Sequence, residues 1–238
     1  KIGGPGNDYY EGDYKFIRDF GGYDVYNLSA DPANPHGAII IDLGGNDHYR
    51  AQTDFVIGSG CLSAGILLDF GGNDRYDAKS FALGSGYFGL GVLYDSGGDD
   101  RYDGDTHVMA AAAFGVGLLI DEGGRDLYNA ALYSQGFGFT EGIGVLYDTD
   151  GSDSYYAGGK YKDILRYEDR YLSLSQGFGY GLRPWMSGGI GAIIDDRGND
   201  NYLTDIFGQG TSYWWSLGVI YDSSGHDNYQ SFQYAQGC

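Results

Sequence analysis

The stretch DFGGNDRY at residues 69–76 contains the pattern that decides the fold, because its frame DxGGxDxY returns along the whole chain. From Asp42 onward, successive copies start 27, 26, 26, 27, 47 and 27 residues apart, so one unit departs grossly from the period. A degenerate copy occupies residues 3–10. The first Asp of the eight full copies is Asp19, Asp42, Asp69, Asp95, Asp121, Asp148, Asp195 or Asp222. A second Asp follows five residues later and a Tyr seven residues later in every copy.

A period of 20 to 50 residues is typical of solenoids, propellers or repeat arrays. A short apolar run precedes each first Asp, as at residues 92–94 and 118–120, and a second extended segment begins at each Tyr. Runs of about four aliphatic residues bounded by Gly and Asp indicate strands. A propeller blade needs about 40 residues. The sequence therefore predicts an all-β, parallel β-helix or solenoid, with coils of about 26–27 residues.

We interpret residues 1–238 as a single solenoid domain, because the repeat runs throughout. The prolines in DPANP, at residues 31–35, predict a loop in place of part of a strand. The chain stops at Gly237 and Cys238 in mid-coil, so we expect it to be a piece of a longer protein. Glycine in the recurring turn supplies positive φ, and the Tyr column predicts stacked rings whose hydroxyls reach solvent or a turn carbonyl.

The composition favours cations as partners. The net charge is −19 and the sequence pI about 4.2, a balance that repels nucleic acid and anionic lipid. The longest apolar run, residues 109–120, is shorter than the roughly 20 residues that a membrane-spanning helix needs. We therefore expect no nucleic-acid partner and no membrane insertion, and an extracellular, cell-surface or periplasmic location.

Stacked coils would place equivalent carboxylates about 4.8 Å apart, where two charges repel by roughly 0.9 kcal/mol even in water. One explanation is that each Asp caps backbone N–H groups of its own turn. Asn would do this without charge, yet no full copy uses Asn at either position. This comparison favours a cation, and oxygen-only ligands favour Ca²⁺. The candidate ligands are Asp69, Asp95, Asp121 and Asp148 at the first position, and Asp8, Asp47, Asp74, Asp100, Asp126, Asp153, Asp200 and Asp227 at the second.

The turn resembles a known calcium-binding repeat. Residues 3–10, GGPGNDYY, fit the GGxGxDxU pattern of hemolysin-type, or RTX, repeats, and the GND triads at 45–47, 72–74 and 198–200 look like its core. The likeness covers about a third of the chain; the nonapeptides are not tandem, and the coil is longer than the RTX coil. The resemblance implies Ca²⁺ bound between successive turns of a parallel β-roll in a secreted protein. The ligands it supports best are Asp8, Asp47, Asp74 and Asp200.

The oversized unit carries two insertions within residues 157–190, and it reverses the local charge pattern. Loops on a rigid scaffold are frequent binding sites, and Arg, Trp and Tyr suit a protein interface or stacking on sugar rings. The alternative is a solvated loop with a short helix at residues 163–171. The candidate binding residues are Lys160, Lys162, Arg166, Tyr167, Arg170, Arg183, Trp185, Trp214 and Trp215.

The sequence thus predicts a noncatalytic, extracytoplasmic structural or interaction module: a calcium-stabilised spacer, adhesion or assembly subunit with a protein partner. No catalytic residue and no organic cofactor is predicted, because the chain has no nucleophile elbow, no HExxH and no Cys/His metal spacing. The alternative hypothesis is a carbohydrate-active β-helix enzyme, a polysaccharide lyase or hydrolase, or a glycan-binding module that uses the surface at residues 157–190.

Overall fold

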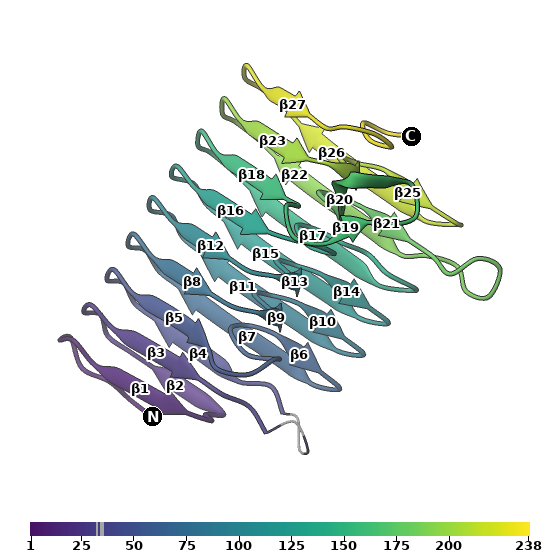
Figure 1. Cartoon of the computed structure of the whole chain (residues 1–238). Helices are drawn as coiled ribbons and strands as arrows, with labels where there is room; N and C mark the ends of the chain where they lie inside the picture. The colour runs from purple at the N-terminus through teal and green to yellow at the C-terminus, as the bar shows by residue number, and fades with distance from the viewer. Residues whose placement is uncertain (32, 34–35) are drawn as a thin grey trace.

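The structure, a computed structural model, describes residues 1–31, 33 and 36–238, which form a single stack of β-coils (Figure 1). Three of the five residues of the predicted loop at 31–35 lie outside this description. No helix occurs within the described ranges, so none there has the length and apolarity to cross a membrane. The prediction of an all-β parallel solenoid is confirmed.

Two long parallel sheets form the walls of the solenoid, and their strand order follows the chain, coil upon coil. The strands of the first wall end at the first Asp of the frame, or one residue before it in β2: β2 (Phe16–Arg18), β4 (Ile39–Asp42), β7 (Ala64–Asp69), β11 (Leu90–Asp95), β15 (Val116–Asp121), β17 (Ile143–Asp148), β22 (Ile190–Asp195) and β26 (Leu217–Asp222). The strands that contain the recurring Tyr are β1 (Tyr9–Gly12), β3 (Val25–Leu28), β5 (His48–Ala51), β8 (Arg75–Asp77), β12 (Arg101–Asp103), β16 (Leu127–Ala130), β18 (Ser154–Ala157), β23 (Asn201–Thr204) and β27 (Asn228–Gln230).

Shorter strands complete the coils on the side away from the Gly-rich turns. They are β6 (Gly60–Cys61), β9 (Ser80–Ala82), β10 (Gly86–Tyr87), β13 (Thr106–Val108), β14 (Ala112–Ala113), β21 (Gly179–Tyr180), β24 (Ile206–Gly208) and β25 (Ser212–Tyr213). The register follows the frame throughout: Asp95 pairs with Asp121, and Tyr102 pairs with Tyr128. Equivalent residues of successive repeats therefore lie directly above one another.

The core lies between the two walls and repeats once per coil. Strands such as β11 alternate buried and half-buried positions, which sends Leu93 inward from one wall while Tyr102 points inward from the other. The rings of Tyr76 and Tyr102 stack with centroids 4.7 Å apart and planes 2° apart. Contrary to the sequence prediction, the tyrosine hydroxyls reach neither solvent nor a turn carbonyl. The rings of Tyr76 and Tyr102 are fully buried, and their hydroxyls donate hydrogen bonds to Asp95 and Asp121, which stand at the first Asp position of the frame.

The Gly-rich turn joins the walls at the narrow edge of each coil, and its second glycine has a steric role. Gly98 has φ 154°, and a Cβ added there would lie 1.4 Å from the carbonyl oxygen of Gly72 in the preceding coil. No side chain fits between the two backbones, so only glycine allows the turns to stack at the spacing of the sheets.

The enlarged coil carries the two insertions predicted from the sequence. The first forms a hairpin in which β19 (Lys162–Asp163) pairs antiparallel with β20 (Tyr167–Ser175). The short helix at 163–171, which belonged to the solvated-loop alternative, is wrong, because this segment forms the hairpin: Lys162 pairs with Tyr171 and Asp163 with Tyr167. The second insertion is a loop closed by an antiparallel bridge between Leu182 and Met186, and it protrudes from the stack (Figure 1).

Candidate functional sites: a buried carboxylate row and the enlarged coil

The first Asp of each frame forms the first column, and in the coils from Asp19 to Asp148 both carboxylate oxygens of this residue are hydrogen-bonded. In Asp195 and Asp222, Oδ1 is buried without a hydrogen-bond partner. In Asp95, Oδ1 accepts the backbone N–H of Gly97 at 2.9 Å, and Oδ2 accepts the hydroxyl of Tyr76 at 2.5 Å. Asp121 repeats this arrangement with Gly123 at 3.0 Å and Tyr102 at 2.7 Å. The turn capping considered from the sequence is therefore present in this column. These donors lower the pKa of Asp95, but loss of solvation, followed by repulsion from Asp121, outweighs them and raises this pKa to about 7.

The second-column carboxylates have only one of their two oxygens satisfied. Oδ1 of Asp100 accepts the backbone N–H of Asp74 in the preceding coil at 2.6 Å, and Oδ1 of Asp126 accepts that of Asp100 at 2.6 Å. The other oxygen is buried without a hydrogen-bond partner, in residues that are at most 3% exposed. This holds for Oδ2 of Asp24, Asp47, Asp74, Asp100, Asp126, Asp153 and Asp200.

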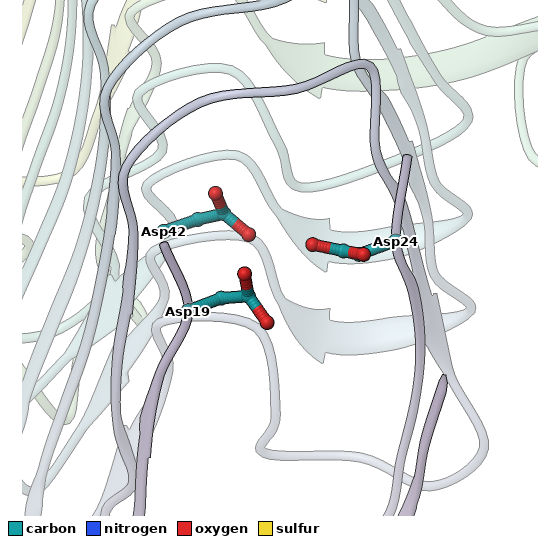
Figure 2. A group of neighbouring side chains, drawn as sticks. All are labelled: Asp19, Asp24 and Asp42. Atoms are coloured by element: carbon teal, nitrogen blue, oxygen red, sulfur yellow. The ribbon is translucent and has the colours of Figure 1, made fainter. Parts of the chain in front are cut away.

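The two columns face each other across the interior of the narrow edge. Figure 2 shows Asp24 on one wall pointing toward Asp19 and Asp42 on the other. One oxygen from each of these residues lies within 4.8 Å of the other two. The same closeness holds for the groups Asp42, Asp47 and Asp69; Asp74, Asp95 and Asp100; Asp100, Asp121 and Asp126; and Asp126, Asp148 and Asp153. We call this continuous line of buried carboxylates the carboxylate row.

Burial makes the row electrostatically costly. Loss of solvation, followed by repulsion from Asp69, raises the pKa of Asp74 to about 10. Loss of solvation, followed by repulsion from Asp95, raises the pKa of Asp100 to about 8. The same burial raises the pKa of the neighbouring Tyr76 well above its usual value, so this phenol stays a donor. At neutral pH the row therefore needs protons or cations to offset its charge.

The donor set of the row fits a hard cation. All the grouped side chains are carboxylates, without the nitrogen or sulfur ligands that transition metals favour. Ca²⁺ takes oxygen ligands at about 2.3–2.6 Å in irregular geometries, so ligands on opposite sides of one ion lie up to about 5 Å apart. The grouped oxygens, within 4.8 Å of one another, meet this requirement.

The row differs from the predicted ligand set at its ends. Asp8 is only half-buried, and its Oδ2 accepts the backbone N–H of Gly4, within a coil that has Gly3 at the first-column position. Asp227, in the final coil, is also half-buried. Conversely, Asp19, Asp24 and Asp42 belong to the row, although they were not among the candidate ligands. Their place in the DxGGxDxY frame was the signal that could have identified them.

The hairpin of the enlarged coil engages most of the predicted basic residues in contacts within the chain. Arg166 donates to Asp163 at 2.7 Å and lies over the ring of Phe207, 4.7 Å from its centroid. Arg170 lies 4.0 Å from the centroid of Phe232. Lys160 pairs with Asp105, Tyr167 packs edge-on against Phe232, and Lys162 is exposed in β19. Lys160 and Arg166 are thus paired with acidic residues of the chain itself.

The tryptophans lie around the second insertion. Arg183 stacks over Trp214, 5.3 Å from its ring centroid, while Trp185 is 83% and Trp215 78% exposed. In the hairpin, Ile164 and Leu165 are 80% and 84% exposed. A hollow of about 270 Å³ lies beside the hairpin; its lining includes Leu165, Arg166, Phe178, Tyr180, Phe207 and Tyr213. The predicted binding residues thus form two groups, one on the hairpin and one around the tryptophans.

A glutamine column was not recognised from the sequence as a structural feature. Nε2 of Gln176 donates to the carbonyls of Tyr155 and Leu203, at 2.9 and 3.3 Å, and so ties two coils together. Gln135 and Gln209 make equivalent bridges in their own coils. Earlier coils place Leu83 and Met109 at this corner with the same positive φ. The recurring QG pair signalled the position but not the role.

The fold and the row together define a class: a parallel β-solenoid repeat protein whose narrow edge encloses paired columns of aspartate. Comparison of this chain with protein-family models, with curated proteins and with solved structures found no match. Its function is therefore argued from its own residues.

Proposed function

We propose that this chain is a noncatalytic structural and interaction module, a calcium-stabilised β-solenoid that presents the two insertions of its enlarged coil to a protein partner. The observation that carries the proposal is the contrast between one protruding coil and an otherwise unbroken stack. Among the residues that the structure describes, the coils repeat the register of their neighbours in the two walls, and the enlarged coil adds a hairpin and a projecting loop to this stack.

The stack suits a spacer or scaffold. Its walls are continuous eight- and nine-stranded parallel sheets, and its interior repeats the same tyrosine, aliphatic and aspartate positions in successive coils. A solenoid of this kind is stiff along its axis, because each coil is fixed by hydrogen bonds to the coils on either side. Such a rod holds a binding surface at a set distance from its attachment.

The exposed side chains of the enlarged coil support a protein partner. Ile164, Leu165, Trp185 and Trp215 are each more than three-quarters exposed, and Trp and Arg are enriched at protein interfaces. Large apolar side chains gathered near the two insertions cost solubility unless something covers them. We therefore assign the partner-binding surface to these four residues together with Arg183.

Glycan binding is the second candidate function, since exposed tryptophan faces also stack on sugar rings. It is favoured by Trp185 and Trp215, whose side chains remain uncovered. A lyase or hydrolase is less well supported. A lyase would need an available basic residue, yet Arg166 and Arg170 are paired with Asp163 and Asp205 and lie over aromatic rings.

The deciding experiment compares three versions of the protein: unchanged, Leu165→Ala with Trp185→Ala, and the control Tyr23→Ala. Tyr23 is 65% exposed on an ordinary coil. Each version is cross-linked in extracts of the source cells, probed on a glycan array and incubated with polysaccharides. We expect a protein adduct that the double variant loses and the control keeps. A glycan signal with the same dependence would support the second candidate, and depolymerisation would overturn the noncatalytic assignment.

An extracytoplasmic location belongs to the same proposal. Extracellular calcium modules bind Ca²⁺ with dissociation constants of about 10⁻⁴–10⁻³ M, which are filled outside the cytosol. Fractionation of the source cells should recover the chain outside the cytoplasm, and recovery in the cytosol alone would contradict this part of the proposal.

A further inference from the structure

We propose that the carboxylate row is a one-dimensional series of divalent-cation sites inside the solenoid, one ion per coil, held between the two aspartate columns and not in the exposed turn loops. The inference deepens the calcium part of the proposed function and rests on it for the identity of the ion. Its ligands are the first-column and second-column carboxylates of adjacent coils.

The unpartnered oxygens locate the sites. From Asp24 to Asp200, each second-column Asp accepts a backbone N–H of the preceding coil with Oδ1 and leaves Oδ2 buried without a partner. Figure 2 shows this side chain directed at the opposing carboxylates, as Asp24 is toward Asp19 and Asp42. A capping role would need only Oδ1, and Asn would fill it. A cation coordinated by several carboxylates at once explains why the second oxygen is present.

The charge of the carboxylates in each coil determines the valence of the proposed cation. Asp95 and Asp100 contribute two carboxylates to one coil, and Asp121 and Asp126 contribute two to the next. No Lys, Arg or His forms an ion pair with these four residues within the part of the chain that the structure describes. One divalent cation per coil balances the charge. Asp100 belongs to two of the grouped triads, so it is placed to bridge successive ions.

The first coil shows where the row stops. Gly3 stands at the first-column position, and a Cβ built on it would lie 1.9 Å from Oδ2 of Asp19 and 2.0 Å from the hydroxyl of Tyr10. The side-chain direction at Gly3 thus leads straight into the row, but the residue carries no carboxylate. Asp8 accordingly has no opposing acid in its own coil, and the row begins with Asp19 and Asp24.

The test counts ions and uses the tyrosines as reporters. The full chain is stripped with EGTA and brought to equilibrium by dialysis against CaCl₂, and its bound calcium is measured as the excess over the dialysate. In parallel it is titrated with Tb³⁺ under excitation of tyrosine. We expect several calcium ions per chain, and terbium emission that added Ca²⁺ suppresses, because the tyrosine hydroxyls contact the proposed ligands.

Matched variants separate the interior from the turn surface. Asp100→Asn keeps the Oδ1 acceptor and removes the free carboxylate oxygen, whereas Asp99→Asn changes the exposed neighbour in the same turn, whose side chain is 56% exposed. We expect Asp100→Asn to lose one or two ions and Asp99→Asn to lose none. Asp24→Asn, near the end of the stack, should lose one ion and serves if the central variant fails to fold.

Two outcomes would overturn the inference: an unchanged calcium count in folded Asp100→Asn or Asp24→Asn, or the absence of bound calcium in the unchanged chain. Either would leave protons as the means of neutralising the row. The number of bound ions does not depend on Leu165 or Trp185. The Leu165→Ala and Trp185→Ala double variant therefore tests partner binding and leaves the carboxylate row unchanged. The two proposals can therefore fail separately.

Discussion

The hydroxyl of Tyr76 in one coil donates a hydrogen bond to the carboxylate of Asp95 in the next coil, at 2.5 Å in the centre of the protein. This contact joins the aromatic stack to the carboxylate row, and equivalent contacts recur along the solenoid. Tyrosine is therefore not interchangeable with phenylalanine in this column, although both rings would stack equally well.

Replacing Tyr76 with Phe should lower the free energy of unfolding by about 1–3 kcal/mol, because it removes a donor from a buried carboxylate. Urea denaturation measures the change. Tyr23→Phe is the control, since Tyr23 is largely exposed, and it should alter stability by less than about 0.5 kcal/mol. Equal stability of the two variants would show that the hydroxyl of Tyr76 contributes nothing.

Replacing Gly98 with Ala should destabilise the fold by at least about 3 kcal/mol, because overpacking and strained φ act together. The new Cβ would collide with the carbonyl oxygen of Gly72. Gly6 occupies the same position of the degenerate first copy and has no atom within 4 Å of a built Cβ. Gly6→Ala should therefore melt close to the unchanged protein, and a comparable loss in both variants would contradict the steric explanation.

Stability should depend on calcium. A ligand that binds only the folded chain contributes RT ln(1 + [L]/Kd), which is about 1.4 kcal/mol per site at ten times the dissociation constant. Calorimetric scans in EGTA and in increasing CaCl₂ should show a rising melting temperature. A melting temperature that stays constant across millimolar Ca²⁺ would remove calcium from the proposal and leave the fold as described.

In the chain stripped of divalent cations, stability should fall as pH rises. Burial raises the pKa of Asp47 to about 7 and that of Asp100 to about 8 in the folded chain, whereas an unfolded Asp titrates near 3.9. The folded chain therefore binds more protons than the unfolded chain between these values, and the free energy of unfolding decreases with increasing pH. Its contribution is complete below about pH 4 and is lost as pH passes through the raised values.

Urea titrations at pH 5, 7 and 9 in EGTA measure this dependence. The loss between pH 5 and 9 should shrink in saturating CaCl₂, because the cation replaces the protons on the row. Stability that is level or increasing with pH in EGTA would show that the buried carboxylates carry another counter-charge.

The architecture could be predicted from the sequence because its cause is periodic. The frame fixes a strand before Asp95, a Gly-rich turn, and a second strand at Tyr102, and repetition at nearly constant spacing leaves stacking as the way to bury the apolar runs. The register of the strands could be predicted from the same repeated residues, because a shift of one residue would turn every buried side chain toward solvent.

The interior of the narrow edge could not be predicted, because the direction of a side chain depends on the turn that carries it. Asp in a Gly-rich turn is ordinarily a surface residue, so nothing in the sequence indicated that both columns point inward, and the tyrosine hydroxyls were expected to reach solvent or a turn carbonyl. The structure turns Asp95, Asp100 and Tyr76 inward. Likewise, the i, i+4 spacing of Arg166 and Arg170 suggested a helix where residues 162–171 form a hairpin.

Residues at the same position of adjacent repeats pair with each other, as Asp95 does with Asp121. Each repeat can therefore be added or removed as a unit. A gene duplication that inserted another copy of residues 95–120 would offer matching edges to the units on both sides, and a deletion of the same length would close the gap. The distance between the enlarged coil and either end could then change by whole steps during evolution. The proposed binding surface would keep its shape, while its distance from the ends of the solenoid would change.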